Sequence, residues 1–113
     1  MNRRAFEALV EREVASLHGW VRKNLDNLAV VVDERHAGED LLGLFEGPSR
    51  LEREPGVTDS PTQVVLYRKA IEEEAEGDAD LPRVVRETLA HEIGHYFGMS
   101  EEEIEVFEKE WAK

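Results

Sequence analysis

The sequence contains no cysteine, which excludes both a disulfide scaffold and a metal site built on thiolates. We therefore expect a protein of the reducing cytoplasm. No apolar run is long enough to cross a membrane, and we expect no signal peptide, because the N-terminal residues lack its apolar segment. Amide side chains are also scarce, and together with abundant Glu and Arg this indicates a thermophilic source. The complete set of amides is Asn2, Asn24, Asn27 and Gln63.

Positively charged residues are also few. The sequence has 14 Lys and Arg against 26 Asp and Glu, which gives a formal net charge of -12. Such a chain repels phosphate backbones and anionic lipids, so we expect neither nucleic acid nor a membrane surface as a partner. The densest acidic run, residues 72–80, is typical of a solvated helix end and loop. The alternative interpretation is a rim that attracts basic peptides.

The length of 113 residues, with 41% hydrophobic and 35% charged residues, predicts one domain spanning residues 1–113. Apolar periodicity and turn residues predict the order α-β-β-β-α-α-α. This order indicates an α+β domain, in which a small mixed sheet of three to four strands packs against the N-terminal helix and the helix from Leu81. The expected helices cover residues 3–24, 68–75, 81 onward and 100 onward, and the expected strands cover 28–32, 41–46 and 63–67. Residues 47–61 hold three of the four prolines and predict a long polar loop that could roof a cleft.

Residues 91–101 carry the pattern HExxHxxGxxE, which says most about function. On a helix, His91 and His95 lie one turn apart on the same face, so two imidazole nitrogens can converge on one zinc ion. Glu92 lies beside that pair, where its carboxylate can reach a metal-bound water and act as a general base. The pattern therefore predicts a metal-dependent hydrolase of peptide bonds. Other divalent metal ions can bind the same ligands, so the pattern does not decide between zinc and another divalent metal.

The segment after the second histidine predicts a third ligand. Gly98 can end the helix with a left-handed residue, after which the chain folds back and can deliver the Glu101 carboxylate. A competing interpretation is a capping box, in which Ser100 is the N-cap of a last helix and Glu103 reaches back to it. The two interpretations are compatible, and Glu102 is the alternative third ligand if the loop turns differently.

These residues resemble the zincin active-site consensus, and the glycine-containing extension is similar to the metzincin form. The whole chain resembles a family of small bacterial zincin-like metallopeptidases, long catalogued as a domain of unknown function. The segments that carry the resemblance are Phe6–Val10, Asp26–Val32, Leu41–Gly47 and the motif that begins at His91. The resemblance implies a minimal zincin fold and a peptide or protein as substrate.

Position by position, the resemblance implies His91 and His95 as zinc ligands, Glu92 as the general base and Glu101 as the third ligand. Glu101 departs from the family, which usually has Asp there, although a carboxylate still ligates zinc well. Metzincins place a methionine turn downstream of the motif. Met99 lies inside the loop and does not match that position.

Other side chains receive weaker interpretations. Tyr96 and Tyr67 are candidates to stabilise an oxyanion, although packing is the favoured role for both. His18 is expected at the surface or its boundary and His36 in a solvent-exposed loop, and neither has the spacing to join His91.

Three alternative functions remain. A metal-dependent ribonuclease requires a third histidine and usually lacks the glutamate after the first, so Glu92, Glu101 and the acidic charge oppose it. A non-catalytic zincin-fold module that binds a metal or a protein agrees with the small size, which leaves little wall for a deep cleft. In the third, the motif is accidental and no metal binds. The sequence does not predict the oligomeric state.

Overall fold

The computed structural model describes residues 1–17, 19–23, 28–49 and 62–111. The prediction for His18 and most of the predicted loop at 47–61 lie outside the described residues. Within them, no helix is both long and apolar enough to span a membrane.

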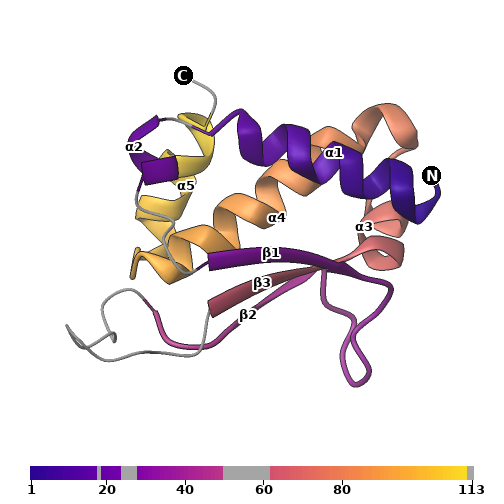
Figure 1. Cartoon of the computed structure of the whole chain (residues 1–113), viewed down its shortest axis with the longest axis horizontal. Helices are drawn as coiled ribbons and strands as arrows, with labels where there is room; N and C mark the ends of the chain where they lie inside the picture. The colour runs from indigo at the N-terminus through magenta and orange to yellow at the C-terminus, as the bar shows by residue number, and fades with distance from the viewer. Residues whose placement is uncertain (18, 24–27, 50–61, 112–113) are drawn as a thin grey trace.

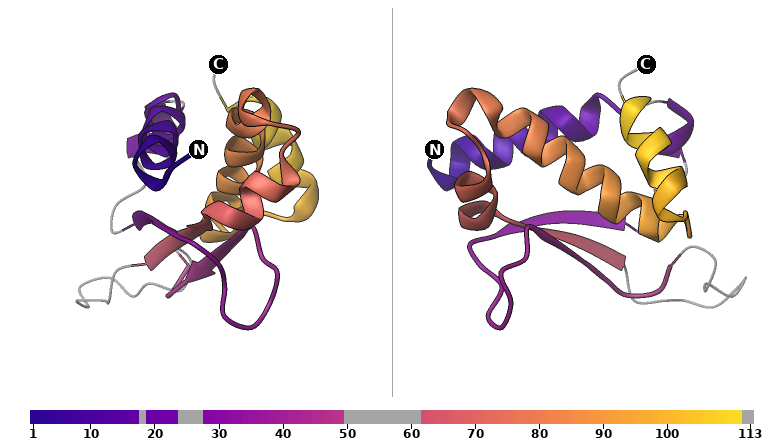
Figure 2. Two further views of the ribbon diagram at one scale, coloured as in Figure 1. Left: turned by 90° about the vertical axis from the view of Figure 1, so that its right-hand side faces the viewer. Right: turned by 180° about the vertical axis from the view of Figure 1, so that it is seen from behind.

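The described elements form two layers, with the helices on one face of a small sheet (Figure 1). The helices are α1 (Arg3–Ala15), α2 (Gly19–Lys23), α3 (Arg68–Glu74), α4 (Leu81–Tyr96) and α5 (Glu101–Lys109), with a 3-10 turn, η2, at Asp78–Asp80. The strands are β1 (Leu28–Asp33), β2 (Gly43–Glu46) and β3 (Thr62–Tyr67). The predicted α+β class and the predicted strand positions are confirmed to within two residues. Figure 2 shows α1 and α4 side by side above the sheet.

The sheet is mixed, with strand order β1-β3-β2. β3 lies in the centre, parallel to β1 and antiparallel to β2. The sequence left open whether residues 41–46 or 63–67 form the sheet edge. The structure shows that β2 is an edge strand and that α4 packs across β2 and β3.

The core lies between the sheet and the helices, and α4 forms its centre. Val64 and Leu66 of β3 are fully buried against it, as are Val85, Leu89 and Ile93 of α4. Burying these side chains stabilises the fold by about 1.5–3 kcal/mol each before the entropy of ordering is subtracted. The buried helix that the motif requires is therefore present.

The predicted N-terminal helix of residues 3–24 is wrong in its extent, because α1 ends at Ala15 and α2 begins at Gly19. The Ser16 hydroxyl donates a hydrogen bond to the Glu13 carbonyl oxygen, and the indole of Trp111 donates to the same oxygen. Because the Glu13 carbonyl oxygen accepts these two hydrogen bonds, it does not require a backbone N–H from the next helical turn, and the helix can end here. Leu17 is buried beyond the break, so the apolar periodicity continues although the helix does not.

Asp80 precedes α4 as predicted, but its carboxylate does not cap the helix. It instead accepts hydrogen bonds from the Arg83 guanidinium and from the backbone N–H of Glu76. These partners lower the pKa of Asp80 to about 2. Pro82, in contrast, lies in the first turn of α4 as expected.

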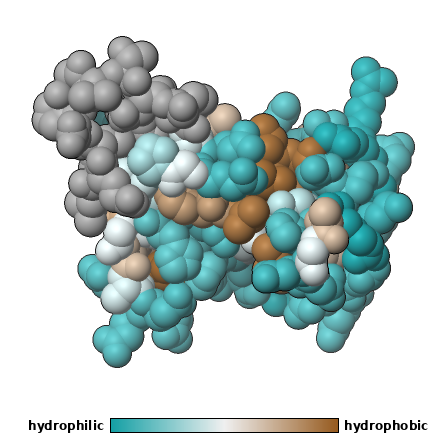
Figure 3. Space-filling view, turned by 90° about the horizontal axis from the view of Figure 1, so that it is seen from below, coloured by the Kyte–Doolittle hydropathy of each residue, from teal (hydrophilic) through white to brown (hydrophobic). Residues whose placement is uncertain are grey.

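The underside of the sheet carries a second, smaller apolar cluster. Val65 and Tyr67 of β3 are buried there, Ala70 of α3 belongs to the same cluster, and Leu44 packs against it. Seen from below, apolar surface gathers near the centre of this face, with hydrophilic side chains around it (Figure 3). His36 is half-buried in this region and packs edge-on against Tyr67, so the prediction that it is solvent-exposed is wrong.

The turn from α4 to α5 brings two helices into close contact. Gly98 has a left-handed φ of 76°, which ends α4 as the sequence predicted. Beyond it, Ile104 of α5 packs directly over Gly94 of α4, where a Cβ atom would lie 2.4 Å from the Ile104 Cγ1 atom. Only glycine leaves room for this crossing, which sets the distance of α5 from the histidines of α4.

We expect Gly94→Ala to lower the free energy of unfolding by about 1–3 kcal/mol, although alanine favours a helix by nearly 1 kcal/mol. The overlap with Ile104 outweighs that preference. Chemical denaturation of the wild type, Gly94→Ala, Ile104→Ala and the double variant measures the coupling, because truncating Ile104 leaves only its Cβ atom at an ordinary 3.5 Å. Additive effects of the two substitutions would contradict the close crossing.

Candidate metal centre

Two histidines form the base of the site on the last two turns of α4. His91 and His95 are four residues apart, so their rings project from the same face of the helix. Their Nε2 atoms are 3.1 Å apart and the rings meet edge to face. Both side chains are about 40% exposed, so an ion can reach these nitrogens from solvent.

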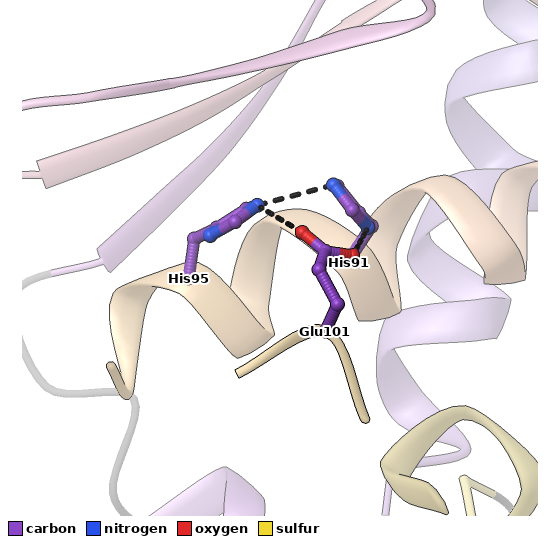
Figure 4. A group of neighbouring side chains, drawn as sticks. All are labelled: His91, His95 and Glu101. Carbon is purple, nitrogen blue, oxygen red and sulfur yellow. Dashed lines mark hydrogen bonds and ion pairs between the residues drawn. The ribbon is translucent and has the colours of Figure 1, made fainter. Parts of the chain in front are cut away.

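Glu101, the first residue of α5, extends over the two rings (Figure 4). One carboxylate oxygen lies 3.7 Å from Nδ1 of His91 and the other lies 3.7 Å from Nε2 of His95. The capping box is confirmed: Ser100 accepts from the Glu103 backbone N–H, and the Glu103 carboxylate accepts from the Ser100 N–H. The cap thus fixes the first turn of α5, which carries Glu101 toward the histidines.

The spacing of these donor atoms suits a small tetrahedral cation. One ligand atom from each of His91, His95 and Glu101 lies within 4.8 Å of the others. A tetrahedral zinc ion with bonds of about 2.0–2.1 Å holds its ligand atoms about 3.3 Å apart, close to the observed nitrogen separation. The Glu101 side chain is 72% exposed, which leaves room for a small adjustment toward an ion. Glu102 lies outside this group.

Glu92 lies beside the histidines and is half-buried against the sheet. Burial raises the pKa of Glu92 above the usual value for a glutamate, and Glu101 adds to the rise, while His91 and His95 oppose it. A Cβ atom on Gly43 of β2 would lie 3.4 Å from the Glu92 Cγ atom and 2.7 Å from the Thr88 Cγ2 atom. Glycine at this position thus allows the edge strand to approach the carboxylate closely.

A cavity of about 350 Å³ opens beside His91 and Glu92. It extends from β2 across α4 to α5, and its lining includes Glu74, Glu87 and Glu108. The sequence interpretation placed Glu74 in the acidic run 72–80, as a solvated helix end or a rim for basic peptides, and assigned no role to Glu87 and Glu108. One signal was available, because Glu87 precedes His91 by four residues and so lies on the same face of α4. Glu108 offered no such signal, since only the packing of α5 brings it there.

The two tyrosines proposed as oxyanion candidates are both buried, in agreement with the packing role favoured for them. Tyr96 lies in the core, with its ring against Phe45 and Phe97. Tyr67 belongs to the apolar cluster on the underside of the sheet, and burial raises its pKa. The underside is the face opposite α4, so Tyr67 lies away from the histidines.

The fold and the site together place two histidines of α4 and one carboxylate of α5 where they could hold one metal ion. The chain belongs to the zincin-like metallopeptidase family, whose family model matches residues 25–111. This match confirms the resemblance inferred from the motif and the two strand segments. The Phe6–Val10 segment lies outside the matched residues.

A solved structure with a similar fold is a conserved hypothetical protein from T. thermophilus, with 23% sequence identity and a TM-score of 0.61. The similarity covers 86% of this chain and 94% of that chain. At this identity the likeness concerns the fold alone. No curated protein matches this sequence.

Proposed function

We propose that this protein is a zinc-dependent metallopeptidase that hydrolyses peptide bonds, with His91, His95 and Glu101 as metal ligands and Glu92 as the general base. The observation that carries the proposal is the convergence of two imidazoles and one carboxylate at the junction of α4 and α5. Two histidines and a carboxylate form a donor set typical of catalytic zinc sites, which keep a fourth position open. The exposure of all three side chains would leave that position accessible from solvent.

Zinc held by these three side chains would act as a Lewis acid, which acidifies water and polarises a carbonyl group. The chain itself supplies the proton transfers. The Glu92 carboxylate would accept a proton from the attacking water and pass it to the leaving amine.

The edge strand β2 offers a place for the substrate backbone. β2 is paired only with β3 among the described strands, and Gly43 brings it next to Glu92. An extended peptide could pair with the outer edge of β2 and pass in front of the metal ligands. This mode of binding agrees with a peptide or protein substrate.

Removal and return of the metal tests the proposal. We expect the protein to hydrolyse members of a mixed peptide pool when loaded with stoichiometric zinc, to lose that activity after dialysis against a chelator, and to regain it when zinc is added. Mass spectrometry of the pool detects and locates each cleavage. Hydrolysis that is indifferent to the chelator, or a zinc-loaded protein that cleaves no peptide, would contradict the proposed activity.

A second candidate is a non-catalytic module that binds zinc or a protein partner through the same fold. The modest size of the cavity favours it, since about 350 Å³ lies near the lower end of the volumes of ligand pockets. The two candidates differ in their dependence on Glu92, because only a peptidase needs a base beside its metal.

A further inference from the structure

The cavity beside His91 and Glu92 has walls of two kinds. Leu42, Val84 and the methyl-bearing Thr88 provide apolar surface. Glu87 of α4, Glu108 of α5 and Glu74 of α3 contribute carboxylates from three different helices. Because His91 and Glu92 also line this cavity, a side chain that occupies it lies next to the proposed reacting centre.

The carboxylates of this cavity are poorly compensated. No Lys or Arg is among its lining residues in the described part of the chain. Arg83, which forms an ion pair with Glu87, is shared with Asp80. Burial raises the pKa of Glu108, and the negative charges of Glu87 and Glu105 add to the rise, while His91 and Lys109 oppose it. With four glutamates and no Lys or Arg in its described lining, the cavity is expected to attract a guest cation.

The two kinds of wall match the two parts of a long basic side chain. The aliphatic stem of arginine or lysine packs well on apolar surface while its charged end reaches polar groups. A guanidinium also forms strong, directional hydrogen bonds with carboxylates. A cavity of about 350 Å³ suits one such side chain rather than a large ligand. An acidic guest side chain would be repelled by the same carboxylates.

We propose that this cavity is a specificity subsite that accepts an arginine or lysine side chain next to the scissile bond, with Glu87 and Glu108 as the residues that select it. The proposal deepens the proposed peptidase function and rests on it. It also gives the acidic surface of the cavity a role beyond solubility.

The test uses a peptide that zinc-loaded protein cleaves at a mapped bond, with the residue on either side of that bond varied in turn. Arginine is compared with citrulline, its uncharged near-isostere, and with glutamate. We expect kcat/KM to be at least about tenfold higher for arginine than for citrulline, and lowest for glutamate. Glu108→Gln and Glu87→Gln should each reduce the arginine-to-citrulline ratio of kcat/KM, measured for both peptides on the same preparation. Glu110→Gln, at the end of the same helix and outside the cavity, should keep the ratio of the wild type.

Two results would overturn the subsite. One is an equal kcat/KM for arginine and citrulline, and the other is a preference that survives in both Glu87→Gln and Glu108→Gln. If no peptide is cleaved, the peptidase proposal fails, and binding then decides the subsite separately. Calorimetry with zinc-loaded Glu92→Gln protein should show at least about tenfold tighter binding of the arginine peptide than of the citrulline peptide. Equal affinities for the two peptides would contradict the proposed subsite.

Discussion

Replacing Glu92 with glutamine is expected to lower kcat for peptide hydrolysis by about 100- to 10,000-fold while zinc stays bound at the level of the wild type. Glutamine has nearly the shape of glutamate but cannot accept the proton of the attacking water. Because Glu92 is not among the three converging donor residues, its loss leaves the proposed ligands in place. Peptide hydrolysis and metal content, measured on the same preparation, separate the two effects.

Glu102→Gln is the matched control for this experiment. Glu102 lies one residue after Glu101, carries the same charge and is exposed outside the group of proposed ligands. It should retain nearly full activity. A Glu92→Gln protein that is as active as the wild type would exclude Glu92 as the base. If the zinc-loaded wild type also cleaves no peptide, the result supports the second candidate, a non-catalytic module that binds zinc or a protein partner.

His95→Ala is expected to weaken zinc binding by more than about 100-fold, because even groups that only support a zinc ligand contribute 10- to 100-fold. The Nε2 atom of His95 lies 3.1 Å from that of His91 and 3.7 Å from a Glu101 oxygen, so its removal opens the centre of the group. Metal analysis of protein purified without chelator should find stoichiometric zinc in the wild type and only traces in the variant.

Thermal unfolding provides a second readout that does not depend on activity. Zinc at about 100 times its Kd stabilises a protein by about 2.7 kcal/mol, which raises the Tm of a domain of this size by roughly 10–20 °C. The wild type should show this rise and His95→Ala should not. Glu101→Ala should also reduce it, whereas Glu102→Ala should keep it. A zinc-induced rise of the same size in wild type and His95→Ala would contradict the proposed ligand set.

Much of the fold was predictable because its signals are local. A β-branched run placed β1, apolar segments bounded by turn residues placed β2 and β3, and the Ser100–Glu103 capping box marked the start of α5. The spacing of His91 and His95 followed from helix geometry alone. The N-terminal helix was predicted too long because its end depends on Trp111, which lies about a hundred positions away along the chain. No local pattern reports such a contact.

The glutamates of the cavity show the same limit at the functional site. Glu87 and Glu108 look like ordinary surface residues of charged helices, and the sequence assigned them no role. Only the packing of α4 against α5, through Gly94 and Ile104, brings them to one cavity. Whether a carboxylate is solvated or directed into a cavity is a property of the assembled helices.

The sequence by itself determined which residues can serve as metal donors and the local elements that carry them, because helix periodicity and capping act within a few residues. Tertiary structure decided that Glu101, rather than Glu102, meets the histidines, and that β2 forms an edge beside Glu92. The physical reason is that both arrangements depend on close packing between segments distant in the chain. The packing energy depends on how closely the surfaces of two segments fit together. The sequence of one segment specifies only its own surface.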